Sequence, residues 1–179
     1  MMYKHLFELN DDPFKITSNI FLQIIFVQQL NKLIDMKRKF DEKKVLKILK
    51  NIFELEMAGV VRYTHYSLMI FGSNRLPLVD FFRSQAKESL AHADLVGEHI
   101  TGLGGHPPIN AISIKDSNKH EISEILKETL AHEQKAISVY YKLLNEVSNK
   151  SVYLEEYSRS MIQQEELHSQ EVEKMIKTN

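Results

Sequence analysis

The sequence predicts an all-α protein, an antiparallel four-helix bundle with a long crossover between the second and third helices. Glycine and proline are scarce, with 6 and 4 among 179 residues, which favours long helices over a sandwich or barrel with many tight turns. Apolar residues recur at helical spacing over long stretches. The breaks between these stretches give a short loop, a long connection and a second short loop, which is typical of such a bundle.

The four long helices are expected after residue 40. Asp41 is a suitable N-cap for the first helix, which should run to about Phe71, before the break at Gly72. The other three are expected over about residues 78–103, 119–147 and 151–176. The second helix should stop at Gly104 and Gly105, and the residues up to about 118 would form the long connection.

Residues 1–40 differ from the rest of the chain, and we expect them to form an N-terminal extension with an accessory helix over Phe14–Met36. We expect residues 41–179 to form the bundle domain. The longest apolar run, Ile20 to Val27, is far shorter than the roughly 20 residues of a membrane span. It also lacks a signal-peptide cleavage site. We therefore expect a cytoplasmic protein that does not associate with membranes.

Composition excludes several classes of function. The net charge of −1 gives no general basic surface, so nucleic acid is not an expected partner. The chain has no cysteine, which excludes disulfides, thiolate metal sites and cysteine nucleophiles. Any transition metal must therefore be held by histidine and carboxylate side chains.

The two halves of the chain repeat one arrangement of side chains. Glu56 precedes Tyr63 by seven residues in the first helix, and Glu133 precedes Tyr140 by seven in the third. Seven residues make nearly two helical turns, so each glutamate shares a helix face with its tyrosine. Taken alone, the two tyrosines are more often core residues with a satisfied hydroxyl group.

The second and fourth helices each carry a glutamate and a histidine one turn apart. These pairs are Glu88 with His92 and Glu165 with His168, at spacings of four and three residues. Each pair alone is weak support for a metal site, because such spacings also occur on solvated helix faces. Acids and imidazoles on four helices in this order are much stronger support, because two iron ions need several carboxylates and are completed by imidazoles.

Three segments carry a family resemblance. Phe53–Met69 (FELEMAGVVRYTHYSLM), Gln85–Pro108 (QAKESLAHADLVGEHITGLGGHPP) and Glu165–Met175 (EELHSQEVEKM) resemble bacterioferritins and their bacterial ferritin-like relatives. The resemblance covers about residues 41–177. It implies the ferritin-like form of the bundle, with a di-iron ferroxidase centre that oxidises Fe(II) with oxygen or peroxide. It also implies iron storage or detoxification by a homo-oligomer, a cage of twenty-four subunits or a smaller assembly.

Carried over to this sequence, the resemblance assigns roles to individual residues. Glu56 and Glu133 correspond to the lone terminal carboxylates, and Tyr63 to a tyrosine beside the centre, the one candidate catalytic side chain. The full set of expected metal ligands is Glu56, Glu88, His92, Glu133, Glu165 and His168. Manganese or zinc would accept the same ligands as iron.

Two positions depart from the family pattern. The second bridging glutamate should stand three residues before His92, where this chain has Ser89; the acid is Glu88 instead. Without a glutamate at this position, the resemblance does not by itself imply full ferroxidase activity. A haem-ligating methionine should stand two residues before the same histidine, where this chain has Leu90, so haem is not supported.

Two alternatives remain open. The first is a peroxide-consuming di-iron oxidoreductase of rubrerythrin type, although nothing resembles the cysteine-rich rubredoxin segment. The second is a non-catalytic ferritin-like structural protein with a degraded metal site, which Ser89 favours.

Overall fold

The computed structural model describes residues 23–29, 40–109, 114 and 117–177. The chain divides into two compact units, Met1–Lys39 and Phe40–Asn179, and each is described by itself. In the first unit, residues 23–29 are helical. The helix expected over Phe14–Met36 lies mostly outside the described residues, and the role of residues 1–40 stays a prediction.

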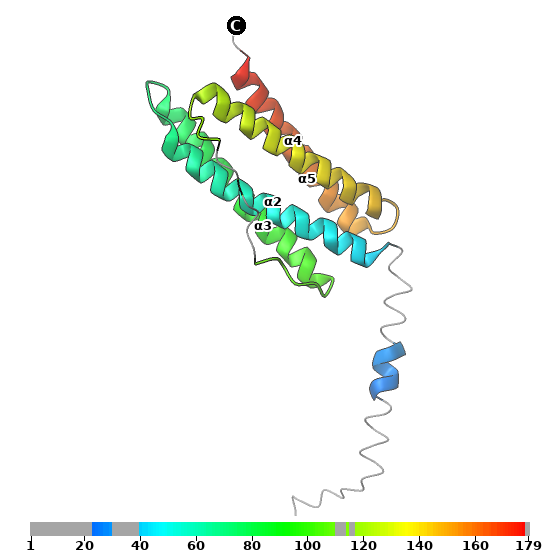
Figure 1. The fold of residues 1–179 in the computed structure, drawn as a ribbon. Helices are drawn as coiled ribbons and strands as arrows, with labels where there is room; N and C mark the ends of the chain where they lie inside the picture. Colours follow the sequence, from blue (N-terminus) through cyan, green and yellow to red (C-terminus); the bar gives the residue numbers. More distant parts are fainter. Residues whose placement is uncertain (1–22, 30–39, 110–113, 115–116, 178–179) are drawn as a thin grey trace, which may run out of the picture. The chain divides into compact units, whose positions relative to one another are not determined.

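The second unit contains four long helices in the expected order. They are α2 (Glu42–Met69), α3 (Arg75–Gly102), α4 (Ile122–Val147) and α5 (Val152–Ile176). Helix α2 packs along α3, α4 packs along α5, and α2 also contacts α4, so the two helix pairs close into one bundle (Figure 1). The predicted bundle with a long crossover between its second and third long helices is confirmed. Across the described residues, no helix combines the length and the apolar character needed to cross a membrane.

Residues at the first turns of α2 and α3 explain where these helices begin. Asp41 caps α2 as predicted, since its side chain accepts a hydrogen bond of 3.1 Å from the Lys44 backbone N–H. Helix α3 begins at Arg75, earlier than predicted, and includes Pro77 in its first turn. Backbone N–H groups in the first turn have no acceptor within the helix, so a proline there removes no hydrogen bond.

Two glycines mark the ends of the first helix pair. Gly72, between α2 and α3, has a φ angle of +96°, and Gly104, just after α3, has a φ angle of +73°. Glycine adopts this left-handed region without the strain that a side chain brings, so the chain can turn sharply at both points. Both breaks were predicted from the sequence.

Two apolar clusters fill the bundle on either side of a polar layer. The first contains, among others, Val45, Leu49, Ile52, Leu55, Val139, Tyr140, Leu143, Leu154 and Met161. The second contains Tyr63, Tyr66, Ile70, Val79, Phe82, Ala86, Ile125, Leu126 and Val172.

The predicted metal ligands lie between these clusters along each helix. In α2, Glu56 follows Leu55 of the first cluster and precedes Tyr63 of the second. In α4, Glu133 lies between Leu126 of the second cluster and Val139 of the first. The same order holds for His92 in α3 and Glu165 in α5. The polar layer is therefore enclosed by apolar side chains at both ends.

Leu49→Ala should lower the free energy of unfolding by about 2–5 kcal/mol, the usual range for a fully buried leucine. Leu49 is completely inaccessible and belongs to the first apolar cluster. Urea denaturation followed by circular dichroism measures the effect. Lys47→Ala, on an exposed position of the same helix, serves as the control and should change stability by less than about 0.5 kcal/mol. Equal effects of the two substitutions would contradict the packing described.

Candidate metal centre

The polar layer gathers side chains from all four long helices. Glu56 from α2, His92 from α3, Glu133 from α4 and Glu165 from α5 are each less than a tenth exposed. His168, one turn after Glu165 on α5, is partly buried. Three carboxyl groups in a dry interior are costly unless a cation or hydrogen bonds offset their charge. The charge of these groups must therefore be offset by cations, by protons or by hydrogen bonds.

The first group of ligand atoms joins Glu56, His92 and Glu165, which each offer one atom within 4.8 Å of the others. His92 Nδ1 lies 3.1 Å from Glu165 Oε1 and 3.7 Å from Glu56 Oε2. These three side chains come from three different helices, so bundle packing alone brings them together.

The second group joins Glu133, Glu165 and His168, again with one ligand atom each within 4.8 Å of the others. His168 Nδ1 lies 3.9 Å from Glu165 Oε2. Glu165 thus belongs to both groups, and its two oxygens face different histidines. A carboxylate placed in this way can be shared by two cations.

Two tyrosines hold the two lone carboxylates from the opposite helix. The Tyr140 hydroxyl on α4 donates to Glu56 Oε1 at 2.7 Å, and the Tyr63 hydroxyl on α2 donates to Glu133 Oε1. The exchange is reciprocal, because each helix supplies one carboxylate and one hydroxyl. The seven-residue spacing seen twice in the sequence therefore places the two pairs opposite each other. Tyr63 and Tyr140 take equivalent positions beside the ligand groups, and a catalytic role for Tyr63 stays a prediction.

Glu88 belongs to neither ligand group. Its side chain is 34% exposed, and its Oε1 lies 3.3 Å from His168 Nε2 at the edge of the site. Ser89, which occupies the expected bridging position, is buried against α2. A Cβ atom placed on Gly59 would lie only 2.7 Å from the Ser89 hydroxyl oxygen, so the glycine leaves room for the serine. Glu165 is therefore the carboxylate that both ligand groups share, and Glu88, the sixth expected ligand, lies at the edge of the site.

Burial and hydrogen bonding shift the pKa values of the carboxyl groups in opposite directions. Burial raises the pKa of both Glu56 and Glu133 above the ordinary glutamate value. Burial also opposes ionisation of Glu165, but the nearby imidazoles of His168 and His92 outweigh it and hold the pKa of Glu165 well below its usual range. Glu165 is therefore the acid that the surrounding groups keep ionised.

The two histidines beside Glu165 have raised pKa values, which favours their positively charged forms. Burial disfavours the charged form of His92, but the nearby carboxylates of Glu165 and Glu56 outweigh burial and raise the pKa of His92 to about 10. The pKa of His168 is also raised, because the nearby Glu165 carboxylate favours the charged imidazole and outweighs desolvation. In the metal-free chain, protons therefore occupy the centre. A divalent cation would displace them, since metal binding requires deprotonated ligands.

These donors fit a pair of divalent cations. The site offers three buried carboxylates and two imidazoles around one shared carboxylate, with Glu88 within reach of the second histidine. Nitrogen and oxygen donors of this kind suit iron, manganese and zinc. The hydrogen bonds from Tyr63 and Tyr140 fix two of the carboxylates in place, which is the usual role of outer-shell partners.

The sequence did not indicate that His132 lies close to the centre. Only its neighbour Glu133 was a predicted ligand, yet the His132 ring lies 5.9 Å from the Tyr63 ring, edge on. Its Nε2 lies 3.3 Å from where a Gly59 Cβ atom would be. Burial lowers the pKa of His132 to about 4, so the ring is neutral. The signal that could have found it is Gly59, a residue without a side chain on the facing helix.

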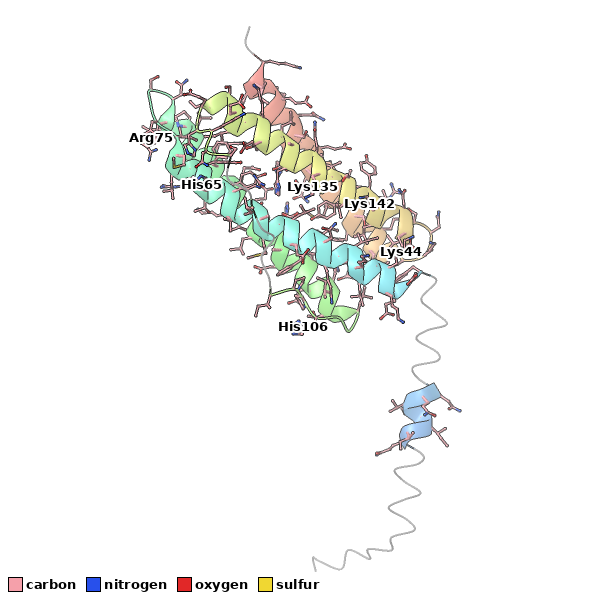
Figure 2. The ribbon with its side chains drawn as sticks, in the orientation of Figure 1. Lys44, His65, Arg75, His106, Lys135 and Lys142 are labelled. Carbon is pink, nitrogen blue, oxygen red and sulfur yellow. The ribbon has the colours of Figure 1, made fainter. Side chains whose placement is uncertain are left out.

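Other histidines lie elsewhere. His106 follows α3, with its Nδ1 2.8 Å from the Pro107 carbonyl oxygen, and Arg75 begins that helix at its opposite end (Figure 2). His99 is 3% exposed and packs against Tyr157 and Tyr153 of α5.

Comparisons with known proteins identify the fold and the family. A crystal structure of a ferritin-like di-iron carboxylate protein from Bacillus anthracis matches with 25% identity and a TM-score of 0.73, over 76% of this chain and 98% of that one. A dodecameric thioferritin, the bacterioferritin-related protein of Bacteroides fragilis, matches with 24% identity and a TM-score of 0.70, over 76% and 86%.

The bacterioferritin of Desulfovibrio desulfuricans has the same fold, with 18% identity and a TM-score of 0.69, over 75% of this chain and 79% of that one. No curated protein sequence matches the chain. The family model for the ferritin-like domain matches residues 46–178, which include all four long helices almost entirely. The chain therefore belongs to the ferritin family, whose members share the ferritin-like domain.

Proposed function

We propose that this chain binds two iron ions between its helices and oxidises Fe(II) with oxygen or peroxide, so that iron is stored or detoxified. The observation that carries the proposal is the position of Glu165. Its two oxygens lie 3.1 Å from His92 Nδ1 and 3.9 Å from His168 Nδ1, so one buried carboxylate belongs to both ligand groups. A shared carboxylate is what two neighbouring cations need.

Each half of the centre would hold one ion. Glu56 and His92 belong to one half, Glu133 and His168 to the other, and Glu165 lies between them. Fe(II) is the substrate, and it supplies the electrons that reduce oxygen or peroxide. The di-iron carboxylate protein of Bacillus anthracis and the di-iron site of the Desulfovibrio bacterioferritin support this assignment. Manganese or zinc remains chemically compatible with the same ligands.

The protein prepares the site by fixing its carboxylates and excluding water. Tyr140 and Tyr63 donate hydrogen bonds to Glu56 and Glu133, so each carboxylate keeps one oxygen occupied and the other free for a cation. The apolar clusters at both ends of the polar layer keep the surroundings dry. In such surroundings the attraction between carboxylate and cation is stronger than in water.

The two halves are not equivalent. Ser89 stands where a second shared carboxylate is expected, and Glu88 approaches only His168, from a partly exposed position. This asymmetry favours, as a second candidate function, a non-catalytic ferritin-like protein whose metal site is degraded. Binding of iron by the two halves separates these candidates.

Assembly decides the fate of the oxidised iron. The Bacteroides fragilis relative is a dodecamer, and we propose that this chain also forms a homo-oligomer. Storage of a mineral requires a closed shell, whereas a peroxide-consuming oxidoreductase of rubrerythrin type does not. The number of subunits therefore separates storage from that alternative.

Anaerobic titration with Fe(II) should give about two ions per chain, and admission of oxygen should then produce a fast rise in ferric absorbance. Glu56→Gln removes a ligand from one group only and should reduce the stoichiometry to about one. Glu165→Gln affects both groups and should weaken both sites by more than about 100-fold, because even outer-shell partners contribute ~10–100-fold.

Glu166→Gln is the matched control, because Glu166 neighbours Glu165 but hydrogen-bonds the exposed Tyr141 hydroxyl. It should bind and oxidise iron like the unmodified chain. Absence of saturable Fe(II) uptake by the unmodified chain would support the degraded-site candidate. Equal stoichiometry for Glu56→Gln and Glu165→Gln would contradict the shared position of Glu165.

Glu133→Gln should stabilise the metal-free protein by about 1–3 kcal/mol at neutral pH, which is the usual cost of a poorly compensated buried polar group. Burial raises the pKa of Glu133, so the folded state favours the protonated acid. The stability that depends on this proton is present below the ordinary glutamate pKa and is lost as the pH rises through the higher pKa of the folded state. The neutral amide avoids that loss and can still accept the Tyr63 hydrogen bond.

Thermal unfolding at pH 5 and pH 8, with and without a divalent metal, measures this effect. The gain from Glu133→Gln should be larger at the higher pH, and the stabilisation by metal should become smaller. Glu171→Gln, on an exposed position of α5, should change neither. A destabilised metal-free Glu133→Gln protein would show that the carboxyl group stabilises the fold without metal.

A further inference from the structure

A hollow between α2 and α4 is lined by four lysine side chains, and we call it the lysine hollow. Its volume is about 630 Å³. The lysines are Lys43, Lys47 and Lys50 from α2 and Lys142 from α4, and one acid, Glu54, also lines the hollow. These side chains carry four positive charges and one negative charge, whereas the whole chain has a net charge of −1. Positive charge is therefore concentrated at this place on the bundle.

The fold leaves the charge of these four lysines uncompensated. Other cationic side chains of the bundle pair with glutamates: Lys44 and Lys150 with Glu146, Lys119 and Lys127 with Glu124, Arg159 with Glu155, and Lys174 with Glu171. Within the part of the chain that the structure describes, no ion pair joins a lysine of the hollow to Glu54 or to any other acid. An anion from solution can therefore take the place that a glutamate takes elsewhere.

The positions of the lysines on α2 also oppose the local preferences of a helix. Lys43, Lys47 and Lys50 follow one another at spacings of four and three residues, so they share one face of α2. Like charges at these spacings repel one another and weaken the helix slightly. Lys43 lies in the first turn, where the positive end of the helix dipole disfavours a cation. Folding alone does not explain this arrangement, whereas a bound anion would relieve the repulsion.

The spacing of the lysines suits a short anion that carries several charges. Lys43 and Lys50 are seven residues apart, which is about 10 Å along the helix axis. An extended anion of similar length can be held by several ammonium groups at once. A lysine ammonium group is a compact positive charge that binds phosphate oxygens. A short chain of linked phosphate groups has the required length and density of charge.

The rest of the lining favours such an anion over a nucleic acid. Leu46, Ile48 and Val139 are apolar, and apolar walls strengthen the field of the charges beside them. None of the described residues that line the hollow is aromatic, so it offers no platform for the base stacking that holds single-stranded nucleic acids. A long polyanion would also extend beyond the hollow, along a chain whose net charge is slightly negative.

We propose that the lysine hollow binds a short oligophosphate, either an inorganic chain or the phosphate chain of a nucleotide. Lys43, Lys47 and Lys50 bind the phosphate oxygens from α2, and Lys142 binds them from α4. Binding neutralises charges that repel one another in the free protein. The hollow shares no residue with either ligand group of the metal centre. The inference therefore goes beyond the proposed function and does not depend on it.

Isothermal titration calorimetry of the full-length, metal-free protein with sodium tripolyphosphate tests the proposal. EDTA in the buffer prevents a metal ion from bridging the anion to the chain. Saturable binding is expected at low salt, and it should weaken as sodium chloride is added, because salt screens exposed charges. ATP should bind as tightly as tripolyphosphate if only the phosphate chain is recognised, and several-fold more tightly if the ligand is a nucleotide. AMP, with a single phosphate group, should bind much more weakly than either.

Lys47→Gln and Lys142→Gln each remove one charge, from opposite helices, and each should weaken the binding of tripolyphosphate several-fold. The double variant should weaken it more than either single change. Lys135→Gln is the matched control, because Lys135 is an exposed residue of α4 about two turns before Lys142 and does not line the hollow (Figure 2). It changes the net charge equally and should bind like the unmodified chain. Equal weakening by Lys135→Gln would overturn the proposal, because net charge alone would then explain binding.

Acetylation of the unmodified chain gives a second readout that needs no substitution. Acetic anhydride modifies accessible lysines, and peptide mass spectrometry locates them. With tripolyphosphate bound, modification of Lys43, Lys47 and Lys142 should fall several-fold, whereas that of Lys135 should not change. Uniform protection of all lysines, or no saturable binding of either tripolyphosphate or ATP, would overturn the inference. So would binding of a single-stranded oligonucleotide that neither short anion can displace, because the hollow would then belong to a nucleic-acid surface.

Discussion

The structure depends on keeping one carboxylate ionised in a dry interior. Glu165 is 4% exposed and lies between two apolar clusters, where an isolated negative charge is unfavourable. His92 and His168 face its two oxygens and stabilise the charge. The remaining carboxyl groups, Glu56 and Glu133, take a hydrogen bond each from a tyrosine and are driven by burial toward protonation. The bundle thus carries a polar layer that is unfavourable without cations and suited to them.

The arrangement of side chains that repeats in the two halves of the sequence gives an approximate twofold symmetry in the structure. This symmetry breaks down at one position. Two hydroxyl–carboxylate pairs exchange between α2 and α4, but only α5 supplies a shared carboxylate. On α3 the corresponding position is Ser89, packed against Gly59, and the nearby acid Glu88 reaches His168 from the rim. One half of the centre is therefore more open to solvent than the other. We expect such an asymmetry to give the two halves different affinities for a cation.

Much of this could be predicted from the sequence, because helical periodicity and glycine breaks are local signals. The four long helices, the Asp41 cap and the long crossover were predicted, and the repeated Glu–Tyr spacings indicated that each glutamate shares a helix face with its tyrosine. Contacts between helices are not local, so the sequence could not show that Glu88 lies at the rim or that His132 contacts Tyr63. The start of α3 was misplaced because Pro77 is tolerated inside a first turn.

Anomalous X-ray diffraction from crystals soaked in Fe(II) or Mn(II) would show whether two cations share the Glu165 carboxylate. Two metal peaks about 3.5–4 Å apart are expected, which is the usual separation in paired sites. Glu165 should lie between them, with His92 beside one ion and His168 beside the other. A single peak, or peaks confined to the exposed acidic side chains of the outer helix faces, would contradict a shared carboxylate.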